Sequence, residues 1–458
     1  MAGKKKQAQL TPEEKLQQAL VPKAEQPYKV PANWCWVKAG IVTNIFNGNS
    51  INEKIKAEKY YGKKEGLIFI ATKDIGFDNV VNYETNVKIT DYQNFKIAPA
   101  NTALLCIEGG SSGRKVGFVD QNVCFGNKLC AFASNIINSK FIYYILQSQC
   151  FYDQFNNKRH GLIGGVSIKD LAEMYFMIPP LAEQQRIVER IESLFAKLDE
   201  AKENLQNVLD GFETRKAAIL HKAFTGELTA NWRKQHGVSM ESWVITTLKD
   251  VCLKITDGTH NSPVNTPIGE YMYITAKNIK ETGVDLSNIT FVSKDVHNEI
   301  YSRCDVQYGD VLYIKDGATT GIATVNNIEI PFSLLSSVAV LRPNKKIILA
   351  KYMAYNLNSS EVKSMMINNM SGNAITRLTL TKIKAAIIKI CSLEEQAEIV
   401  RIIDDLLAKE LQAKELAENA LAKIDLIKKS ILARAFRGEL STNNLADEPA
   451  VELLKRML

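Results

Sequence analysis

The side chains best suited to chemistry are scattered through polar loops, and their spacing matches no catalytic pattern. Gly109 to Lys115 is glycine-rich and basic, but it lacks the G-x-x-x-x-G-K-[ST] spacing by which a loop wraps phosphates. His160 and His260 have no Ser/Asp or Cys partner pattern. Ile178-Pro-Pro-Leu181 lacks the Asn and the aromatic residue with which N-P-P-aromatic motifs hold a flipped base. The sequence therefore predicts no catalytic site in this chain.

Cysteine usage and hydropathy indicate a cytoplasmic protein without a structural metal. The eight cysteines form no C-x-x-C pair, and the five histidines do not cluster near them, so we expect small buried thiols in a reducing compartment and no metal site. No window offers about 18 uncharged apolar residues, so no membrane span is expected. The basic N-terminus is not followed by the apolar segment of a secretory signal.

Most of the excess positive charge lies in two long segments of the chain. Residues 26–180 hold 17 basic and 12 acidic side chains, and residues 236–392 hold 16 and 13. Residues 181–235 are balanced at 9 and 9, and residues 393–440 hold 8 basic and 10 acidic side chains. Such a distribution permits a polyanionic partner without requiring one.

The sequence contains an internal repeat of one long unit. Ala223-Phe-Thr-Gly-Glu-Leu228 recurs as Ala435-Phe-Arg-Gly-Glu-Leu440, and Leu181-Ala-Glu-Gln-Gln-Arg-Ile-Val188 matches Leu393-Glu-Glu-Gln-Ala-Glu-Ile-Val400 at the same offset of 212 residues. Upstream of these blocks the offset between matching segments varies, but their order is the same. Trp36-Val37 matches Trp243-Val244, Phe69–Ile75 matches Tyr273–Ile279, and Ile107–Gly113 matches Ile314–Gly321. A period above 200 residues excludes a solenoid and indicates a domain duplication.

Each copy is predicted to be a mixed module followed by a long helix. Short apolar runs such as Leu67–Ala71 and Asp310–Ile314 are bounded by Gly, Asn and Asp, as strands are, while Lys140–Phe155 and Lys351–Met366 are expected to be helices. This favours an α+β fold over a doubly wound sheet. The resulting division is a tail with a short helix (1–25), a module (26–180), a long helix (181–235), a second module (236–392), a second long helix (393–440) and a C-terminal tail (441–458).

Apolar residues at steps of three and four predict that the two long helices pair with each other. The first seam runs through Ile187, Ile191, Leu194, Leu198, Leu205 and Phe212. The second runs through Ile399, Ile403, Leu406, Ala413, Ala417, Ala420, Ile424 and Ile431. An isolated helix of this length, about 60 Å, must bury such a stripe. Because a module lies between them in sequence, we expect an antiparallel coiled coil; two unrelated coiled coils in an oligomer are the alternative.

These motifs resemble a known family. Pro180–Val188, followed by the heptad helix and Ala223–Leu228, resembles the central conserved region of type I restriction-modification specificity subunits, and the second copy resembles their C-terminal conserved region. Thr11–Leu20 and Pro27–Trp34 resemble the opening of such subunits, and Asp447–Leu458 resembles their closing segment. Leu393-Glu-Glu-Gln departs from the pattern because it lacks the double proline of the first copy.

The resemblance implies two target-recognition domains that each read half of a split, asymmetric site in double-stranded DNA. It also implies that the helices set the gap between the half-sites and dock two modification (methyltransferase) subunits, together with two restriction (motor-nuclease) subunits where the system includes them. S-adenosylmethionine, ATP and Mg would then be bound by the partner subunits, and this chain would bind no cofactor.

Candidate DNA-reading side chains are the polar and basic residues of the loops, since Lys and Arg contact phosphates while Arg and Asn pair with base edges. In the first module these are Lys73, Ser111, Ser112, Arg114, Lys115, Lys158, Arg159 and His160. In the second they are Lys277, Asn278, Lys315, Thr319, Thr320, Asn369 and Arg377. The matched glycine-rich loops are alternatively turns that only maintain the fold.

Two other functions are compatible with the residues. One is the recognition part of a self-contained DNA methyltransferase or nuclease, which would transfer methyl groups or cut DNA without other subunits. The other is a non-enzymatic interaction scaffold whose modules bind protein and leave no footprint on DNA.

Overall fold

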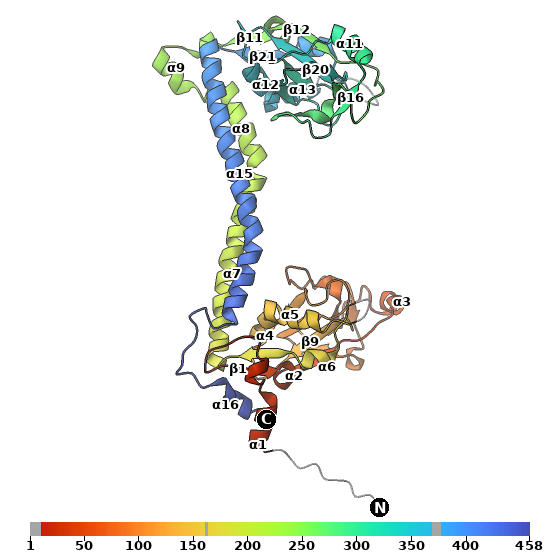
Figure 1. Cartoon of the computed structure of the whole chain (residues 1–458), viewed down its shortest axis with the longest axis vertical. Coiled ribbons are helices and arrows are strands. Elements are labelled where there is room, and N and C mark those ends of the chain that lie inside the picture. Colours follow the sequence, from red (N-terminus) through yellow and green to blue (C-terminus); the bar gives the residue numbers. More distant parts are fainter. Residues whose placement is uncertain (1–10, 161–163, 369–376) are drawn as a thin grey trace, which may run out of the picture. The chain divides into compact units, whose positions relative to one another are not determined.

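The computed structural model describes residues 11–160, 164–368 and 377–458 and divides the chain into two compact units. The first unit comprises residues 1–204 and 420–458, and the second comprises residues 205–419 (Figure 1). Each unit contains one module and one stretch of paired helices. We refer to residues 26–180 as the first head and to residues 236–392 as the second head. Among the described residues, no helix is long and apolar enough to span a membrane.

The first head is built on two small sheets. One is antiparallel throughout, with the order β2 (Asn44–Asn47), β9 (Leu129–Ala133), β6 (Thr102–Cys106) and β7 (Val116–Val119). The other has the order β4 (Lys88–Ile89), β3 (Leu67–Ile70), β8 (Val123–Phe125) and β5 (Ile97–Ala98), in which β3 and β8 are parallel. Alternating apolar residues fully bury β6 and β8 between the layers.

The second head repeats this topology. Its antiparallel sheet has the order β12 (Cys252–Asp257), β20 (Val338–Pro343), β17 (Val311–Ile314) and β18 (Ala323–Val325). Its second sheet has the order β16 (Thr290–Val292), β13 (Tyr271–Ile274) and β19 (Ser333–Leu334), and the pair β13–β19 is parallel, as β3–β8 is. The hairpin of β14 (Ile279–Lys280) and β15 (Gly283–Val284) is the counterpart of the turn that the Ile75–Val81 bridge closes in the first head, and the helix α11 (Lys294–Arg303) is an addition of this head.

The helices of the two heads also correspond in order. The first head has α2 (Ala39–Val42), α3 (Glu53–Ile55), α4 (Ser139–Leu146), α5 (Gln149–Asn157) and α6 (Ile168–Ala172), with short turns η2 (Lys56–Tyr60), η3 (Thr72–Asp74) and η4 (Tyr92–Asn94). The second has α10 (Leu248–Val251), α12 (Ala350–Asn358), α13 (Ser360–Asn368) and α14 (Leu380–Lys384), with turns η5 (Met240–Ser242) and η6 (Ala276–Asn278). Helices and mainly antiparallel strands are thus mixed in both heads, in agreement with the α+β expectation.

A two-stranded ribbon joins each head to its helix and corrects the predicted repeat register. In the first head β1 (Cys35–Lys38) pairs with β10 (Tyr175–Ile178), and in the second β11 (Val244–Thr247) pairs with β21 (Ile387–Ile390). Cys35 lies opposite Ile178 and Val244 opposite Ile390, so Trp34, and not Trp36, corresponds to Trp243. The predicted match was wrong by two residues because two tryptophans flank Cys35, and residue identity alone cannot choose between them.

The loop after the central strand needs a similar correction. Gly113 donates its backbone N–H to the carbonyl of Cys106, and Gly321 donates to the carbonyl of Ile314. Cys106 therefore corresponds to Ile314, and the predicted match of Ile107 with Ile314 was wrong by one residue. The matched block Phe69–Ile75 keeps its register, because its first two residues pair in parallel with β8 just as those of Tyr273–Ile279 pair with β19.

The long helices differ in continuity. The single long helix predicted over residues 181–235 is interrupted at Gly211, which separates α7 (Leu181–Asp210) from α8 (Phe212–Phe224). A further helix, α9 (Ala230–His236), follows at the end of this segment. In the second copy α15 (Leu393–Ala435) runs unbroken over 43 residues. Just after α8, Gly226 has a φ of +83°, which is a left-handed conformation that glycine adopts at low cost.

Within each unit the two helical segments run antiparallel. In the first unit Asp199 of α7 pairs with Lys428 of α15 at 2.6 Å, while the earlier Ile191 shares a core with the later Leu432. In the second unit Arg215 of α8 pairs with Glu410 of α15 at 2.7 Å, and Leu220 shares a core with Ile403. In both pairs, moving toward the C-terminus of one segment means moving toward the N-terminus of the other.

The predicted seam residues are unevenly buried. Ile187, Ile191, Ile399, Ile403, Ala417 and Ile424 are buried, and Leu194, Leu198, Leu205, Phe212, Leu406, Ala420 and Ile431 are half-buried. Ala413 is exposed, so its placement in the seam was wrong. Its place is taken by Lys414, whose ammonium lies 5.1 Å from the centre of the Phe212 ring. The prediction followed apolar residues only, whereas a lysine can bury its methylene stem and keep its charge outside.

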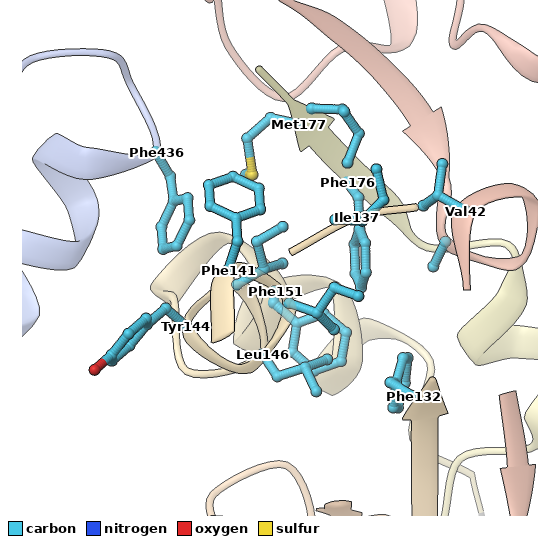
Figure 2. Packing of buried hydrophobic residues seen from close by; sticks show 14 of the residues in the cluster. Val42, Phe132, Ile137, Phe141, Tyr144, Leu146, Phe151, Phe176, Met177 and Phe436 are labelled. Carbon is cyan, nitrogen blue, oxygen red and sulfur yellow. The ribbon is translucent and has the colours of Figure 1, made fainter. Parts of the chain in front are cut away.

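The core of the first unit extends from the head into the helices and the C-terminal segment. Figure 2 shows the ring of Phe436, just beyond α15, facing Phe141 of α4, with Tyr144 beside them; the rings of Phe141 and Phe436 meet edge to face at 5.5 Å. The same cluster includes Leu454 of α16 (Ala450–Lys455) and Leu16 of α1 (Pro12–Ala19). Both ends of the described chain are therefore packed onto this core.

We expect Phe436→Ala to lower the free energy of unfolding of the first unit by about 3–5 kcal/mol, because it removes a fully buried ring. Urea unfolding of the full chain, followed by circular dichroism, measures the change. Leu426→Ala on the same helix is the matched control, since Leu426 is 64% exposed and its loss should cost less than about 0.5 kcal/mol. Equal costs for the two variants would contradict this packing.

Candidate nucleic-acid interface

A buried glutamate ties each head to the first turn of its long helix. In the first unit the Oε2 atom of Glu183 accepts hydrogen bonds from Trp34 Nε1 at 2.7 Å and from Asn443 Nδ2 at 2.9 Å. In the second, Glu395 accepts from Trp243 Nε1 at 3.1 Å and from Arg233 at 2.6 Å. Both carboxylates are fully buried. Each head is thus held to its helix, and its loops keep a defined position relative to that helix.

The next residue in each copy makes a second tie. The side chain of Gln184 donates to the carbonyl of Pro179 at 3.0 Å and accepts from the backbone N–H of Asn138 at 2.9 Å. The side chain of Gln396 likewise donates to the carbonyls of Cys391 and Ile347, each at 2.9 Å. The repeated Glu-Gln pair was visible in the sequence as a motif, but its structural role was not predicted.

In the first head a glycine turn after β6 supports the candidate residues at positions 111 to 115. Gly109 and Gly113 have φ of +88° and +73°, and Ser112 donates its backbone N–H to the carbonyl of Gly109 at 3.0 Å. A Cβ atom at Gly113 would lie 2.6 Å from the Phe155 ring, so glycine is needed there for space as well as for conformation.

Two of the predicted DNA-reading residues, Ser112 and Arg159, stabilise this turn. The Ser112 side chain is buried and donates to the carbonyl of Gly164 at 3.0 Å, and the Arg159 guanidinium donates to Ser112 Oγ at 3.0 Å and to Gly164 at 3.3 Å. The placement of Ser112 among the DNA-reading residues was wrong, because its hydroxyl is used inside the fold. Arg159 is half-buried, whereas Lys158 and His160 on either side of it are exposed.

Three other predicted readers of the first head, Lys73, Arg114 and Lys115, lie around an exposed aromatic ring. Arg114 and Lys115 place their charged groups 5.3 and 4.8 Å from the centre of the Phe77 ring. Lys115 Nζ donates to the carbonyl of Thr72 at 3.3 Å, directly beside the exposed Lys73 in η3. We call Lys73, Phe77, Arg114 and Lys115 the aromatic-basic cluster. Ser111 lies next to it, half-buried, with its Oγ 3.3 Å from Cys106 Sγ.

The loop that carries Phe77 is fixed by Asn79. The side chain of Asn79 accepts from the backbone N–H of Val116 at 3.0 Å and donates to Gln147 Oε1 at 2.9 Å. The hydroxyl of Tyr143 donates to the Asn79 carbonyl at 3.5 Å, and burial raises the pKa of Tyr143 to about 12, so the hydroxyl remains a neutral donor at physiological pH. Asn79 itself has φ of +65°, and Gly76 closes the turn on Val80.

In the second head three predicted readers are structural. Asn278 is buried and caps its own turn by accepting from the backbone N–H of Thr275 at 3.0 Å. Lys315 is buried between Asp257 at 3.5 Å and Asp316 at 3.2 Å, and the Thr320 hydroxyl donates to the Gly317 carbonyl at 2.7 Å. These three assignments were wrong for one reason: the loops have inward-facing polar side chains, and a residue's type does not tell which way it faces.

Three other candidates of the second head remain accessible. Lys277, Thr319 and Arg377 are exposed, and the backbone of Arg377 bridges to that of Asp316, beside the turn that holds Thr319. Asn369 lies outside the described residues. Lys277 occupies the position that Lys73 occupies in the first head, since η6 and η3 are equivalent turns.

Sequence reasoning missed two features of the first head. One is Phe77, an aromatic residue in the polar loop between Gly76 and Asp78. The other is the segment 53–64, in which Lys54, Lys63 and Lys64 are exposed with the intervening Tyr61. The interleaving of basic and aromatic residues is typical of nucleic-acid-binding surfaces and was the signal available for segment 53–64.

The described residues contain no group of three or more His, Cys, Asp or Glu side chains arranged to hold a metal ion. The cysteines are free, and burial raises the pKa of most of them, including that of Cys130 to about 12. Buried, protonated thiols are poor nucleophiles and poor metal ligands.

A duplicated head, repeated with its attached helix and lined with basic loops, defines the class of bipartite nucleic-acid-recognition proteins. The comparisons with known proteins give the family. The model for the type I restriction modification DNA specificity domain matches residues 31–210 and 240–420. The chain belongs to this family, and its role is that of a DNA-specificity subunit of a type I restriction-modification system.

Curated relatives agree over nearly the full length. The chain is 25% identical over 437 residues to the type I restriction enzyme EcoBI specificity subunit of Escherichia coli, covering 91% of this chain and 88% of that one. It is 24% identical over 444 residues to the EcoKI specificity subunit of Escherichia coli strain K12, covering 92% of each chain. Both relatives match across the two heads and the two helical regions.

Solved structures share the fold. A chain from a study of complex assembly and conformational transition of the type I restriction-modification system matches with a TM-score of 0.63 at 18% identity, over 90% of this chain and all of that one. The HsdS subunit from Thermoanaerobacter tengcongensis matches with a TM-score of 0.61 at 17% identity, over 91% of this chain and all of that one.

We expect Arg114→Gln to weaken binding to all duplexes alike and to reduce the slope of log K against log salt by about 0.9, the value for one lost phosphate contact. Fluorescence anisotropy over a salt series measures both quantities. Arg401→Gln is the matched control, because Arg401 is equally exposed but lies on α15 in an ion pair with Glu398 at 2.7 Å. An unchanged slope for Arg114→Gln would remove this residue from the interface.

Proposed function

We propose that the two heads read the two halves of one split, asymmetric target in double-stranded DNA. The observation that carries this proposal is the repeated topology: the same pair of sheets occurs twice, each attached through a buried glutamate to its own long helix. Equivalent frameworks with different loops would contact DNA in equivalent ways and read different bases. The boundaries 26–180 and 236–392 are the extents that we assign to the two target-recognition domains.

In this proposal affinity comes from the loop cations and specificity from contacts to base edges. The exposed Lys73, Arg114, Lys158 and His160 in the first head, and Lys277, Thr319 and Arg377 in the second, are the proposed contacts. Asn369 remains a candidate on sequence alone. The net charges of the two heads favour a polyanion, and the balanced helices give no reason to expect DNA contact there.

We propose that α7, α8 and α15 form an antiparallel coiled coil that sets the gap between the half-sites. The pairs Asp199–Lys428 and Arg215–Glu410 support this arrangement, one in each unit. Asp199 and Arg215 are 16 positions apart along the first helical region, and Glu410 and Lys428 are 18 positions apart along the second, so the two spacings are similar. Lys414 and Lys428, which lie over Phe212 and Phe195, would contribute their stems to the seam.

The helices would also dock the catalytic subunits. Four large apolar side chains of α15 are exposed, namely Leu411, Leu416, Leu426 and Ile427, and exposed apolar residues on a helix favour packing against a partner helix. Two modification subunits would bind there, and two restriction subunits would join them in a complete system. S-adenosylmethionine, ATP and Mg would be held by those partners, so the chain itself would be non-catalytic and act in the cytoplasm, where chromosomal DNA is found.

The test is a methylation assay with tritiated S-adenosylmethionine. We expect the purified full chain to transfer no methyl groups to DNA, and the chain assembled with its modification subunits to methylate adenine within a split motif. Methylome sequencing of cells with and without the chain identifies that motif.

Two outcomes would contradict the proposal. Methyl transfer by the chain alone would indicate a self-contained enzyme. A chain that binds its partner subunits but neither directs methylation nor protects any duplex from cleavage by DNase I would be an interaction scaffold. A variant with both Lys73→Gln and Arg114→Gln separates DNA binding from assembly. It should assemble normally and lose most of its methylation activity at physiological salt.

A further inference from the structure

Phe77 is an exposed ring held in a defined position. Its side chain is 65% exposed, although Asn79, two residues away in the same turn, is anchored by three hydrogen bonds to Val116 of β7, Tyr143 of α4 and Gln147. Exposing a phenylalanine ring to water forgoes the stabilisation that burial would give. A ring that is both exposed and rigidly presented is typical of a contact site for a ligand or partner.

The surroundings of the ring indicate a polyanion that carries apolar groups. The charged groups of Arg114 and Lys115 lie 5.3 and 4.8 Å from the ring centre, and Lys73 is exposed on the adjoining turn. The hydrogen bonds of Lys115 to Thr72 and of Arg114 to Gly110 hold both cations beside the ring. Duplex DNA fits this combination, because its phosphates flank grooves in which each thymine presents a methyl group.

The same position in the second head has a different chemistry. Ile75 corresponds to Ile279, so Phe77 corresponds to Glu281, and Glu281 pairs with Lys216 of α8. In that head the residue is used inside the unit and is not available to DNA. The two heads therefore differ at this position in a way that would make their half-sites differ.

We propose that Phe77 reads a thymine in the first half-site by contacting its C5-methyl group in the major groove. This inference rests on the proposed function, because it assumes that the first head binds duplex DNA. In a duplex the base faces are stacked on one another, so an exposed ring that enters the major groove meets thymine methyl groups and not open base faces. Arg114 and Lys115 then pair with the phosphates that flank this thymine.

Deoxyuridine tests this contact, since it removes only the methyl group from thymine. The full chain, assembled with its modification subunits, is titrated against duplexes in which each thymine of the first half-site is replaced in turn. We expect one replacement to raise Kd about fourfold, as for the loss of one buried methyl group. In Phe77→Ala the same replacement should have no effect, and in Phe77→Leu it should keep part of its effect.

Tyr308→Ala is the matched control, since Tyr308 is a 62% exposed aromatic residue of the second head and its loss should leave the fourfold effect intact. If the wild-type chain binds its target specifically but no replacement matters, or if Phe77→Ala keeps the full effect, the inference is wrong and the proposed function stands. If the wild-type chain shows no preference for any duplex sequence, the proposed function fails, and the inference fails with it.

Discussion

The structure depends on a buried carboxylate at the start of each long helix. Removing Glu183 or Glu395 from water costs several kcal/mol unless its oxygens are hydrogen-bonded. Trp34 and Trp243 supply the equivalent bond in the two units, and the remaining donors are Asn443 and Thr442 in the first and Arg233 and Thr229 in the second. Because any shift of a head would leave its glutamate without these donors, the junction between head and helix is rigid.

Because this junction is rigid, one set of residues maintains each head and another set, in the loops, is free to contact DNA. The sheets, the glycine turns and the inward-facing polar residues recur in both heads, and they position loops whose outward residues differ. Phe77 and Glu281 occupy one framework position with opposite properties, and Asp74 and Asn278 cap equivalent turns with different side chains. A specificity subunit that recognises two unlike half-sites needs this combination, since loop residues can change without altering the way in which either head is attached.

The duplication, the mixed fold and the long helices could be predicted from the sequence because they leave periodic or repeated signals. The orientation of single side chains could not. Ser112, Asn278 and Lys315 are polar loop residues by type, yet each is buried and bonded within its head. In the helix seam Lys414, and not the predicted Ala413, lies over Phe212, because the lysine side chain is apolar over most of its length. Phe77 was missed because a single aromatic residue in a loop has no periodicity to mark it.

The spacing of the two half-sites tests most directly the proposal that the helices set the distance between the heads. One heptad is deleted from each helical region, between residues 200 and 214 and between residues 411 and 427, so that the apolar stripes stay in phase. The helices shorten by about 10 Å, which corresponds to about three base pairs of DNA. Methylome sequencing should then show the original half-sites separated by a shorter gap. The original gap, retained in a folded and active variant, would contradict the role of the helices as a spacer.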